Sequence, residues 1–580
     1  MLMKKCIYFL LISMTHLCAS AQKNSYTVFF KTWNYLKYYH PDFATGKLNA
    51  DSLFLQDVKK ITATTDHNAV IALLTNNLQQ HFSTAAAKAT ATDVIKSNQD
   101  FSWFRESAGI DKGHKQLLEN IYQHRFTGPQ HYYIPNNGYE ADIPHEKVYD
   151  FPKEENLPLE YRLLALAKIQ GCIDYLYPHK QLMNKNFDAY FESLLSRTIT
   201  CQSRKDFEII LAKLVAPLED THAFSFYKQL HFAKDIFHTK LYAPFDYSVF
   251  DHYLLVTKLM IPDACQKAGI HAGDRIVAVN GKSIQDIIQS KKELLSASNP
   301  SVLLYRISQY QDNLIWPDDM ALKKLAIQRN NSGDTVETAI EFIKPTDKKH
   351  IDSIVQYLND EAKRKRQHRL EHPGIAYFRI DQTYKFISGV ADDHIDQTMD
   401  SLLLAASQQK AIIFDMRGYP DWGGFVYTYI YKYFADKDNY FGKYYQQYHQ
   451  NIGTFIYADQ PAIYFPVLTN KSRHTYNGKV FIIVNPQTLS ASEWNTMNLQ
   501  YIFPGSVTIG QQSAGADGDI KRMALPGNYS LEFTGNGIFY PGGAPAQKVG
   551  VHIDEKITYR DIDLLKGQDL EFDWIIKEIL

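Results

Sequence analysis

Residues 480–493 have the sequence Val480-Phe-Ile-Ile-Val-Asn-Pro-Gln-Thr-Leu-Ser490-Ala-Ser-Glu493, and the C-terminal part of the chain is organised around them. The apolar, largely β-branched run at 480–484 predicts a buried strand, and Ser490 followed by Glu493 predicts a helix start. This connection places Ser490 at the carboxyl end of a sheet, where α/β proteins bind ligands and helix N-termini stabilise oxyanions. Ser490 and Glu493 also fit an ordinary capping box, so a structural role stays open at this point.

Length and composition set broad limits on the whole chain. At 580 residues it is too long for one hydrophobic core, which predicts three or more domains. Its formal net charge of −1 gives no electrostatic reason to expect nucleic acid or an anionic membrane as a partner.

The amino terminus has the pattern of a cleaved secretory signal. Lys4 and Lys5 precede an apolar stretch at 6–14, and Ala19-Ser20-Ala21 supplies the small residues of a cleavage site. The apolar stretch is too short to cross a bilayer, and no later stretch is long enough. We therefore expect a signal peptide at 1–21 and an exported chain without stable membrane insertion.

Three cysteines remain after removal of this signal, namely Cys172, Cys201 and Cys265. At most one intramolecular disulfide can form, and sequence proximity favours Cys172 with Cys201. Three buried, unreactive thiols are an equal alternative. No spacing of ligands suggests zinc, so neither a metal nor a cofactor is predicted.

Apolar residues recur at helical spacing through residues 22–240, which predicts a helical N-terminal region. Within it, Thr32-Trp-Asn-Tyr-Leu-Lys-Tyr-Tyr-His-Pro41 parallels Lys168-Ile-Gln-Gly-Cys-Ile-Asp-Tyr-Leu-Tyr-Pro178, which indicates a duplicated helical hairpin. A long irregular connection is expected at 127–158. The region ends in Asp220-Thr221-His222, and a histidine in this setting is either a general base or, more often, a hydrogen-bonded structural residue.

Residues 241–345 change to short strands and turns. The run Ala268-Gly-Ile-His-Ala-Gly-Asp-Arg-Ile-Val-Ala-Val-Asn-Gly281 resembles the best-recognised segment of PDZ domains. PDZ domains bind extended peptides by adding a strand to a sheet edge, so the resemblance implies peptide binding. The charged helical pattern that follows predicts a connector at 346–371.

Residues 372–580 alternate between strand and helix patterns. Apolar strand candidates lie at 374–380, 410–415 and 480–484, and an amphipathic helix is expected at 390–408. A partly parallel sheet surrounded by helices is therefore predicted. After the second strand comes the turn Asp415-Met-Arg417-Gly418, in which glycine permits close approach of backbone N–H groups to a ligand.

The order of these features resembles the tail-specific and tricorn-like serine peptidases, the C-terminal processing peptidase superfamily. The resemblance rests on Asp-x-His at 220–222, the PDZ-like run, the Asp-Met-Arg turn, Ser-x-x-Glu at 490–493, and two later blocks at 507–518 and 549–554. It implies a multidomain α/β protein with an N-terminal helical region, a PDZ-like β domain and a catalytic core of the ClpP/crotonase-like type.

The resemblance also implies the catalytic residues. In the tail-specific branch a lysine in the glycine block is the base, but the matching position here is Ala516, 26 residues after Ser490 (516 − 490). The tricorn-like branch uses a histidine instead, which implies Ser490 as nucleophile and His222 as base. The backbone N–H groups of Ala491 and Gly418 are then expected to bind the oxyanion.

Two further residues are expected to orient the histidine. Thr221 stands where the tricorn-like branch has a hydroxyl residue, and Gln547 stands where it has an acid. A glutamine carbonyl can orient an imidazole but does not stabilise its positive form by charge. Ordinary surface polarity is the alternative for both Thr221 and Gln547.

We therefore expect an exported serine peptidase that hydrolyses extended peptides or protein tails, located in the periplasm by analogy with secreted bacterial relatives. The alternative is a non-catalytic protein on the same scaffold that binds peptides or hydrophobic ligands, as retinoid-binding relatives of the family do. A PDZ adaptor is a weaker third hypothesis, because an adaptor needs no serine and histidine pair.

Overall fold

A computed structural model describes residues 24–76, 78, 95–96, 98–136, 140–183, 187–329, 334–367, 370–436, 440–458 and 475–580. The predicted signal peptide at 1–21 lies outside these ranges. The chain divides into two compact units. The first unit contains Met1–Leu214, Gln446–Ile456 and Lys521–Gly535, and the second contains Val215–Tyr445, Tyr457–Ile520 and Asn536–Leu580.

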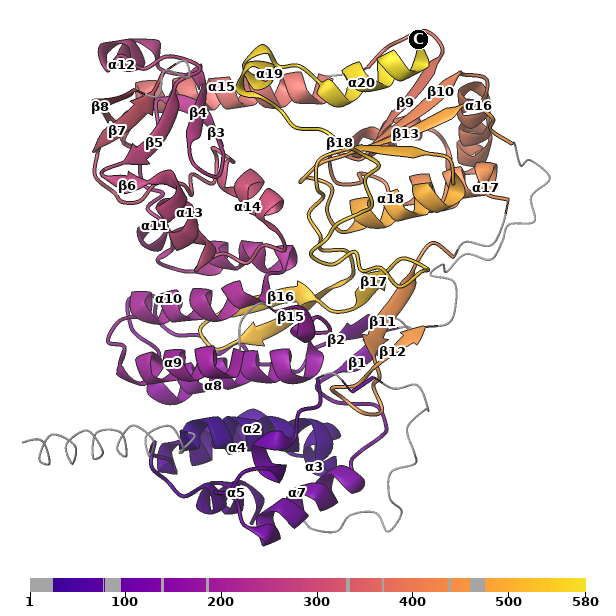
Figure 1. Cartoon of the computed structure of the whole chain (residues 1–580). Coiled ribbons are helices and arrows are strands. Elements are labelled where there is room, and N and C mark those ends of the chain that lie inside the picture. Colours follow the sequence, from indigo (N-terminus) through magenta and orange to yellow (C-terminus); the bar gives the residue numbers. More distant parts are fainter. Residues whose placement is uncertain are drawn as a thin grey trace, which may run out of the picture. The chain divides into compact units, whose positions relative to one another are not determined.

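The first unit is mainly helical, as predicted, and Figure 1 shows its N-terminal helices in indigo to magenta. Two short strand pairs accompany the helices, β1 with β2 and β15 with β16. Its elements are α2 (Ser25–Tyr39), α3 (Pro41–Ala44), α4 (Ala50–Asp57), η1 (Val58–Lys60), α5 (His67–Thr75), α6 (Ser102–Arg105), α7 (Lys112–Gln123), β1 (Ile134–Asn136), β2 (Glu140–Asp142), α8 (Leu159–Gly171), η2 (Cys172–Leu176), η3 (Lys180–Leu182), α9 (Phe187–Thr200), α10 (Arg204–Val215), β15 (Ile520–Leu525) and β16 (Tyr529–Thr534).

Helices α2 and α8, which contain the two copies of the predicted repeat, form the centre of this unit. Every residue of α2 is buried. Gly171 lets the two helices approach closely, because a Cβ atom there would lie 2.0 Å from Asn34 Oδ1. The second copy differs from the first in ending with the π-helical turn η2.

The first unit also takes in two segments that the predicted boundaries assign to the C-terminal core. Tyr39 OH donates to Ile452 O at 2.7 Å, and Arg204 Nε donates to Tyr529 OH at 2.7 Å. These buried contacts join residues more than 300 positions apart (529 − 204 = 325), which no local pattern can indicate. The first compact unit thus includes these two segments, and the predicted domain boundaries at 240 and 372 stay predictions.

The expected disulfide between Cys172 and Cys201 is absent, and both residues, like Cys265, have reduced thiols. Cys172 and Cys265 are buried, whereas Cys201 is partly exposed. The favoured pairing is wrong because proximity in sequence does not bring two side chains into disulfide geometry.

The second unit begins with an antiparallel sheet of order β3-β4-β5-β7-β8, with β6 paired to β5. A turn at Asn280 and Gly281, both with positive φ, joins β5 to β6. The elements of this part are η4 (Ala216–Leu218), η5 (Thr221–Gln229), α11 (Ala233–Ile236), β3 (Phe245–Val249), β4 (Leu254–Leu259), α12 (Pro262–Lys267), β5 (Arg275–Val279), β6 (Lys282–Ser283), α13 (Ile284–Lys292), α14 (Pro300–Ile307), β7 (Leu322–Gln328) and β8 (Thr335–Glu341). The predicted connector is the helix α15 (Lys348–Gln367).

The predicted parallel sheet follows, with strand order β18-β14-β13-β10-β9 and parallel pairing throughout. The three predicted strands are all present, as β9, β10 and β13. The elements of this part are β9 (Ile375–Arg379), η6 (Ile380–Gln382), η7 (Tyr384–Phe386), η8 (Asp392–His394), α16 (Ile395–Ser407), β10 (Ala411–Asp415), η9 (Phe425–Ile430), α17 (Tyr431–Phe434), β11 (Lys443–Gln447), β12 (Phe455–Ala458), β13 (Lys479–Val484), α18 (Ala491–Ile502), β14 (Val507–Gly510), β17 (Gly537–Phe539), β18 (Glu555–Lys556), α19 (Asp561–Lys566) and α20 (Leu570–Ile579).

Side chains alternate between the two faces of this sheet, and each face carries its own core. Ile412 and Ile482 pack with residues of α16, η9, α17 and α18, whereas Ile413 and Ile483 pack with Ile575 of α20. Figure 1 shows α18 and α20 on opposite sides of the strands. This layering explains why the strands are continuous apolar runs, since a strand buried on both faces has no polar side.

Gly510 is required where β14 pairs with β13. It has φ 134°, and a Cβ atom there would lie 2.0 Å from Val484 O. We expect Gly510→Ala to lower the free energy of unfolding by about 1–3 kcal/mol from backbone strain, measured by urea unfolding. Gly505→Ala is the control, because a Cβ atom there meets nothing within 4 Å. Equal stability of the two variants would contradict the argument.

In the part of the chain that the structure describes, every helix is too short or too polar to cross a membrane.

Candidate active site

Ser490 occupies the connection between β13 and α18, as predicted. It is partly buried and immediately precedes Ala491, the first residue of α18. Its φ is 53° and its ψ is −118°, a conformation that is strained for any residue with a side chain. Such strain persists only where the surroundings impose it, and it is concentrated at functional sites.

The turn after β10 lies beside this connection. Thr488 Oγ1 donates to Met416 O at 2.9 Å, and Ser492 Oγ donates to Gly418 O at 2.5 Å. The carboxyl ends of the neighbouring parallel strands β10 and β13 bring the two turns together. Gly418 is thus held close to the start of α18, where the sequence predicts an oxyanion site.

The backbone N–H groups of Ala491 and Gly418, the two predicted oxyanion donors, differ in whether they already have a hydrogen-bond acceptor. Ala491 is at the first position of α18, where a backbone N–H has no acceptor within the helix. Gly418 N, in contrast, donates to Met416 O at 2.9 Å within its own turn. A ligand can therefore use Gly418 only if this bond breaks or is shared.

Glu493 connects Ser490 to the glycine block at 513–516. Its buried carboxylate accepts four hydrogen bonds, from Ser513 Oγ at 2.6 Å, Gly515 N at 2.7 Å, Ala516 N at 3.0 Å and Ser490 N at 3.3 Å. Burial raises the pKa of Glu493 to about 7, and these four donors oppose that rise. Glu493 thus joins the backbone of Ser490 to the glycine block.

We expect Glu493→Gln to change both the stability and its pH dependence. An amide would place its NH₂ against backbone N–H donors, which costs about 1–3 kcal/mol in the free energy of unfolding. Because the folded-state pKa of Glu493 is about 7, above its usual value of 4.5, the folded wild type is most stable below about pH 4.5 and loses this stability as the pH rises to about 7. The stability difference between wild type and variant should therefore narrow over this range in urea unfolding.

The exposed Glu578→Gln is the matched control for this series. A stability difference that widens as the pH rises would show that the four donors outweigh burial and keep Glu493 ionised.

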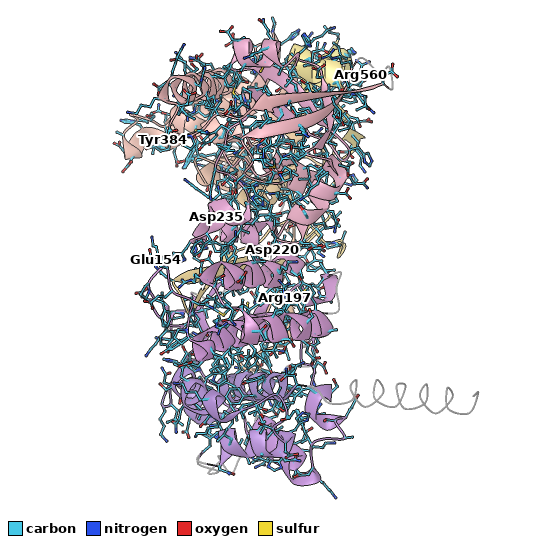
Figure 2. The ribbon with its side chains drawn as sticks, turned by 90° about the vertical axis from the view of Figure 1, so that its left-hand side faces the viewer. Glu154, Arg197, Asp220, Asp235, Tyr384 and Arg560 are labelled. Atoms are coloured by element: carbon cyan, nitrogen blue, oxygen red, sulfur yellow. The ribbon has the colours of Figure 1, made fainter. Side chains whose placement is uncertain are left out.

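His222 lies in η5, the 3-10 helix that Asp220 caps. His222 N donates to Asp220 Oδ1 at 3.0 Å, and His222 Nδ1 lies 3.6 Å from the same oxygen. Asp220 is fully buried, and it is labelled in Figure 2. A carboxylate here favours a proton on Nδ1 and stabilises the imidazolium by charge. The predicted orienting residues did not include Asp220, although the Asp-x-His spacing was a signal for it.

The His222 turn is held by a loop that the sequence did not indicate. Thr221 N donates to Ser298 Oγ at 2.9 Å, and Thr221 Oγ1 donates to Ala514 O at 3.4 Å. Asn299 Nδ2 donates to Ser513 O at 2.9 Å and to Ala514 O at 3.2 Å. The glycine block thus bonds to the His222 turn on one side and, through Glu493, to Ser490 on the other.

Gln547 is buried, with 1% of its surface exposed. Within the described residues, neither its Oε1 nor its Nε2 makes a hydrogen bond. An orienting role of Gln547 toward His222 therefore stays a prediction.

No cluster of three or more His, Cys, Asp or Glu side chains suited to a metal occurs in the described ranges.

A serine on a strained strand-to-helix turn, close to a glycine turn, is a feature that many serine hydrolases share. The same compact unit contains the Asp220 and His222 pair. Comparison with known families agrees, since residues 328–557 match peptidase family S41. This match of residues 328–557 confirms the predicted resemblance, and it supports a serine-type peptidase.

Several solved structures are similar to the chain at low identity. Mature CPAF is 13% identical with a TM-score of 0.48, covering 73% of this chain and 96% of that chain. The photosystem II D1 C-terminal processing protease is 14% identical with a TM-score of 0.32, covering 71% and 98%. The tricorn protease is 14% identical with a TM-score of 0.32, covering 73% and 36%. No curated protein sequence matches the chain.

Proposed function

We propose that this chain is an exported serine peptidase that cleaves extended peptides or protein tails, with Ser490 as nucleophile and His222 as general base. The observation that carries the proposal is the glycine block at 513–516. It hydrogen-bonds the His222 turn through Ala514 and, through Gly515 and Ala516, the Glu493 carboxylate that holds Ser490. Nothing in a purely structural capping box requires this connection.

The proposed reaction begins when His222 removes the proton from Ser490 Oγ as this oxygen attacks the scissile carbonyl carbon. Asp220 stabilises the imidazolium that forms, because its Oδ1 lies 3.6 Å from His222 Nδ1. His222 then returns the proton to the leaving amine, and water hydrolyses the acyl-enzyme by the same steps. Such proton transfer contributes about 10²–10⁴ in rate.

In this proposal the backbone N–H groups of Ala491 and Gly418 donate hydrogen bonds to the tetrahedral oxyanion and stabilise its negative charge. The Gly418 donor becomes available when its bond to Met416 O is exchanged for one to the oxyanion. Each oxyanion donor is worth about 3–4 kcal/mol in the transition state. The hydrogen bond from Ser492 Oγ to Gly418 O holds the peptide unit that follows Gly418, so the turn stays next to the start of α18 during this exchange.

The remaining parts of the proposal concern the substrate and the compartment. Residues 241–345 are proposed to be a PDZ module that holds the substrate tail, and residues 372–580 a core of the ClpP/crotonase-like type. A peptide pulldown without preference for C-termini would remove the PDZ role. Export to the periplasm rests on the pattern at 1–21, and N-terminal sequencing of the chain from the extracytoplasmic fraction should begin at Gln22.

The test of the catalytic proposal is labelling of the purified mature chain with a phosphonate probe for active-site serines. Wild type should label, Ser490→Ala should not, and Ser193→Ala should label as wild type does, since Ser193 is exposed on α9. Labelling of Ser490→Ala would place the nucleophile elsewhere and overturn the assignment.

A second candidate, a non-catalytic peptide- or hydrophobic-ligand-binding protein, is favoured by two observations. Gly418 N already donates to Met416 O, and Gln547 replaces the acid of the tricorn-like branch. If wild type does not label while a known serine peptidase does under the same conditions, this candidate replaces the first.

A further inference from the structure

Two residues next to the proposed catalytic segments form an ion pair that the reaction described above does not use. Lys548 Nζ lies 2.6 Å from Glu219 Oε2, and each of the two side chains is 17% exposed. Glu219 directly precedes Asp220, and Lys548 directly follows Gln547. The pair therefore connects the turn that carries His222 to the segment that carries Gln547.

Both residues adopt backbone conformations that are unfavourable for their side chains. Glu219 has φ 47° and Lys548 has φ 65°, in the left-handed region that non-glycine residues rarely occupy. Glycine or asparagine would adopt these angles at lower cost. The charged side chains are thus placed at two strained positions, where the ion pair offsets part of the cost of each.

The Lys548 backbone is also anchored on the glycine block. Lys548 N donates to Gly515 O at 2.7 Å, and Lys548 O accepts from Asn299 Nδ2 at 3.2 Å. A Cβ atom on Gly515 would lie 2.8 Å from Lys548 O, so the backbones of these two segments are in close contact. Lys548 therefore has backbone bonds to the block that supports Ser490 and a side-chain bond to the His222 turn.

The bonding of Gln547 shows why the ion pair between Glu219 and Lys548 matters for the position of the His222 turn. The Gln547 amide is buried without a hydrogen bond in the described residues, so it does not hold the His222 turn by a direct contact. An ion pair joins these two segments one residue away on each, between Glu219 and Lys548. The charge interaction that Gln547 cannot supply is present in the Glu219 and Lys548 pair.

We propose that Glu219 and Lys548 are positioning residues that hold the His222 turn against the Gln547 segment, and we call them the ion-pair clamp. This inference rests on the proposed function, because the clamp acts through His222. Neither residue touches the reacting atoms. Loss of the clamp misplaces the base relative to Ser490 Oγ, and a misplacement of about 1 Å costs about 10²-fold in rate.

The test combines kinetics with hydrogen exchange in four variants of the full mature chain: Lys548→Met, Glu219→Gln, Lys548→Arg and the charge swap Glu219→Lys with Lys548→Glu. The first two should lower kcat, or the rate of phosphonate labelling, by about 10-fold to 100-fold with KM within about twofold. Lys548→Arg should restore most of the rate, and the charge swap should exceed either single neutral variant.

Lys228→Met is the matched control, because Lys228 lies in the same helix η5 and pairs with Asp312 at 2.9 Å on the surface. Its rate should equal that of wild type. Wild-type rates in Lys548→Met and Glu219→Gln would overturn the clamp, as would a charge swap no better than the single variants.

Hydrogen exchange separates failure of the clamp from failure of the proposed function. Backbone amides at 219–223 and at 545–551 should exchange faster in Lys548→Met and in Glu219→Gln, and at the wild-type rate in Lys548→Arg. If wild type does not label but exchange rises in both segments, the clamp holds and the catalytic proposal fails. If exchange rises in neither segment, the clamp is overturned whether or not wild type labels.

Discussion

Replacing His222 with alanine is expected to lower peptide hydrolysis by about 10²–10⁴-fold, because Ser490 then loses the base that takes its proton. The expected loss falls on kcat, since His222 acts in the transition state and does not bind the substrate. The measurement is the steady-state rate with an unstructured peptide for wild type and for His222→Ala.

The matched control for this prediction is His394→Ala, because the His394 side chain is 64% exposed and lies far along the chain from η5. It should keep the wild-type rate. A His222→Ala variant with unchanged kcat would remove His222 from the mechanism. A variant with unchanged kcat and a raised KM would assign it to substrate binding instead.

The largest expected effect on stability comes from Arg417→Ala. The Arg417 guanidinium donates to Asp415 Oδ1 through Nε at 2.9 Å and to Asp415 Oδ2 through Nη2 at 2.9 Å. Its Nη2 also lies 2.7 Å from Asp569 Oδ2. Asp415 is buried, so removing the arginine leaves a carboxylate in the interior without its charged partner. Breaking a buried pair in this way costs about 3–5 kcal/mol in the free energy of unfolding.

Urea unfolding of Arg417→Ala measures this cost, and two controls define it. Arg522→Ala breaks a surface pair with Glu532 at 2.7 Å, and such pairs are worth about 0–1 kcal/mol. Arg417→Lys keeps the charge but loses the bidentate contact with Asp415. Its free energy of unfolding should therefore lie between those of wild type and Arg417→Ala. Equal stability of Arg417→Ala and Arg522→Ala would contradict the argument.

The sequence was most informative about the parallel sheet. Strands β9, β10 and β13 are predicted from their apolar runs. In β10 and β13 the run is continuous because both faces of the strand are buried. The placement of Gly418 and Ser490 at the same edge of the sheet follows from the same prediction, because both residues come after the carboxyl ends of neighbouring parallel strands.

The supports of the site could not be predicted in this way. Ser298 and Asn299 reach the His222 turn and the glycine block by a few polar contacts across 77 and 214 positions of sequence. Serine and asparagine are common in loops, so nothing in their local pattern distinguishes these two from others. The ion pair of Glu219 with Lys548 spans 329 positions and is equally invisible before folding.

The absence of the expected disulfide and the composition of the first unit both depend on how distant segments of the chain pack. Cys172 and Cys201 are near in sequence, but α9 separates them and each keeps its thiol. The hairpin of β15 and β16 joins the first unit through contacts such as that of Tyr529 with Arg204. Pattern and composition describe local structure, whereas these outcomes depend on how distant segments pack.

The bond between Arg417 and Asp569 also has a consequence for the time at which the peptidase becomes competent. The turn that carries Gly418 is complete only when a partner 152 residues further along the chain has been made. At a synthesis rate of about 5–20 residues per second, this interval is about 8–30 s. During that time a nascent chain contains β10 and its turn without the contact to Asp569 that anchors them. The turn after β10 therefore reaches its final set of bonds only after Asp569, the N-cap residue of α20, has been made.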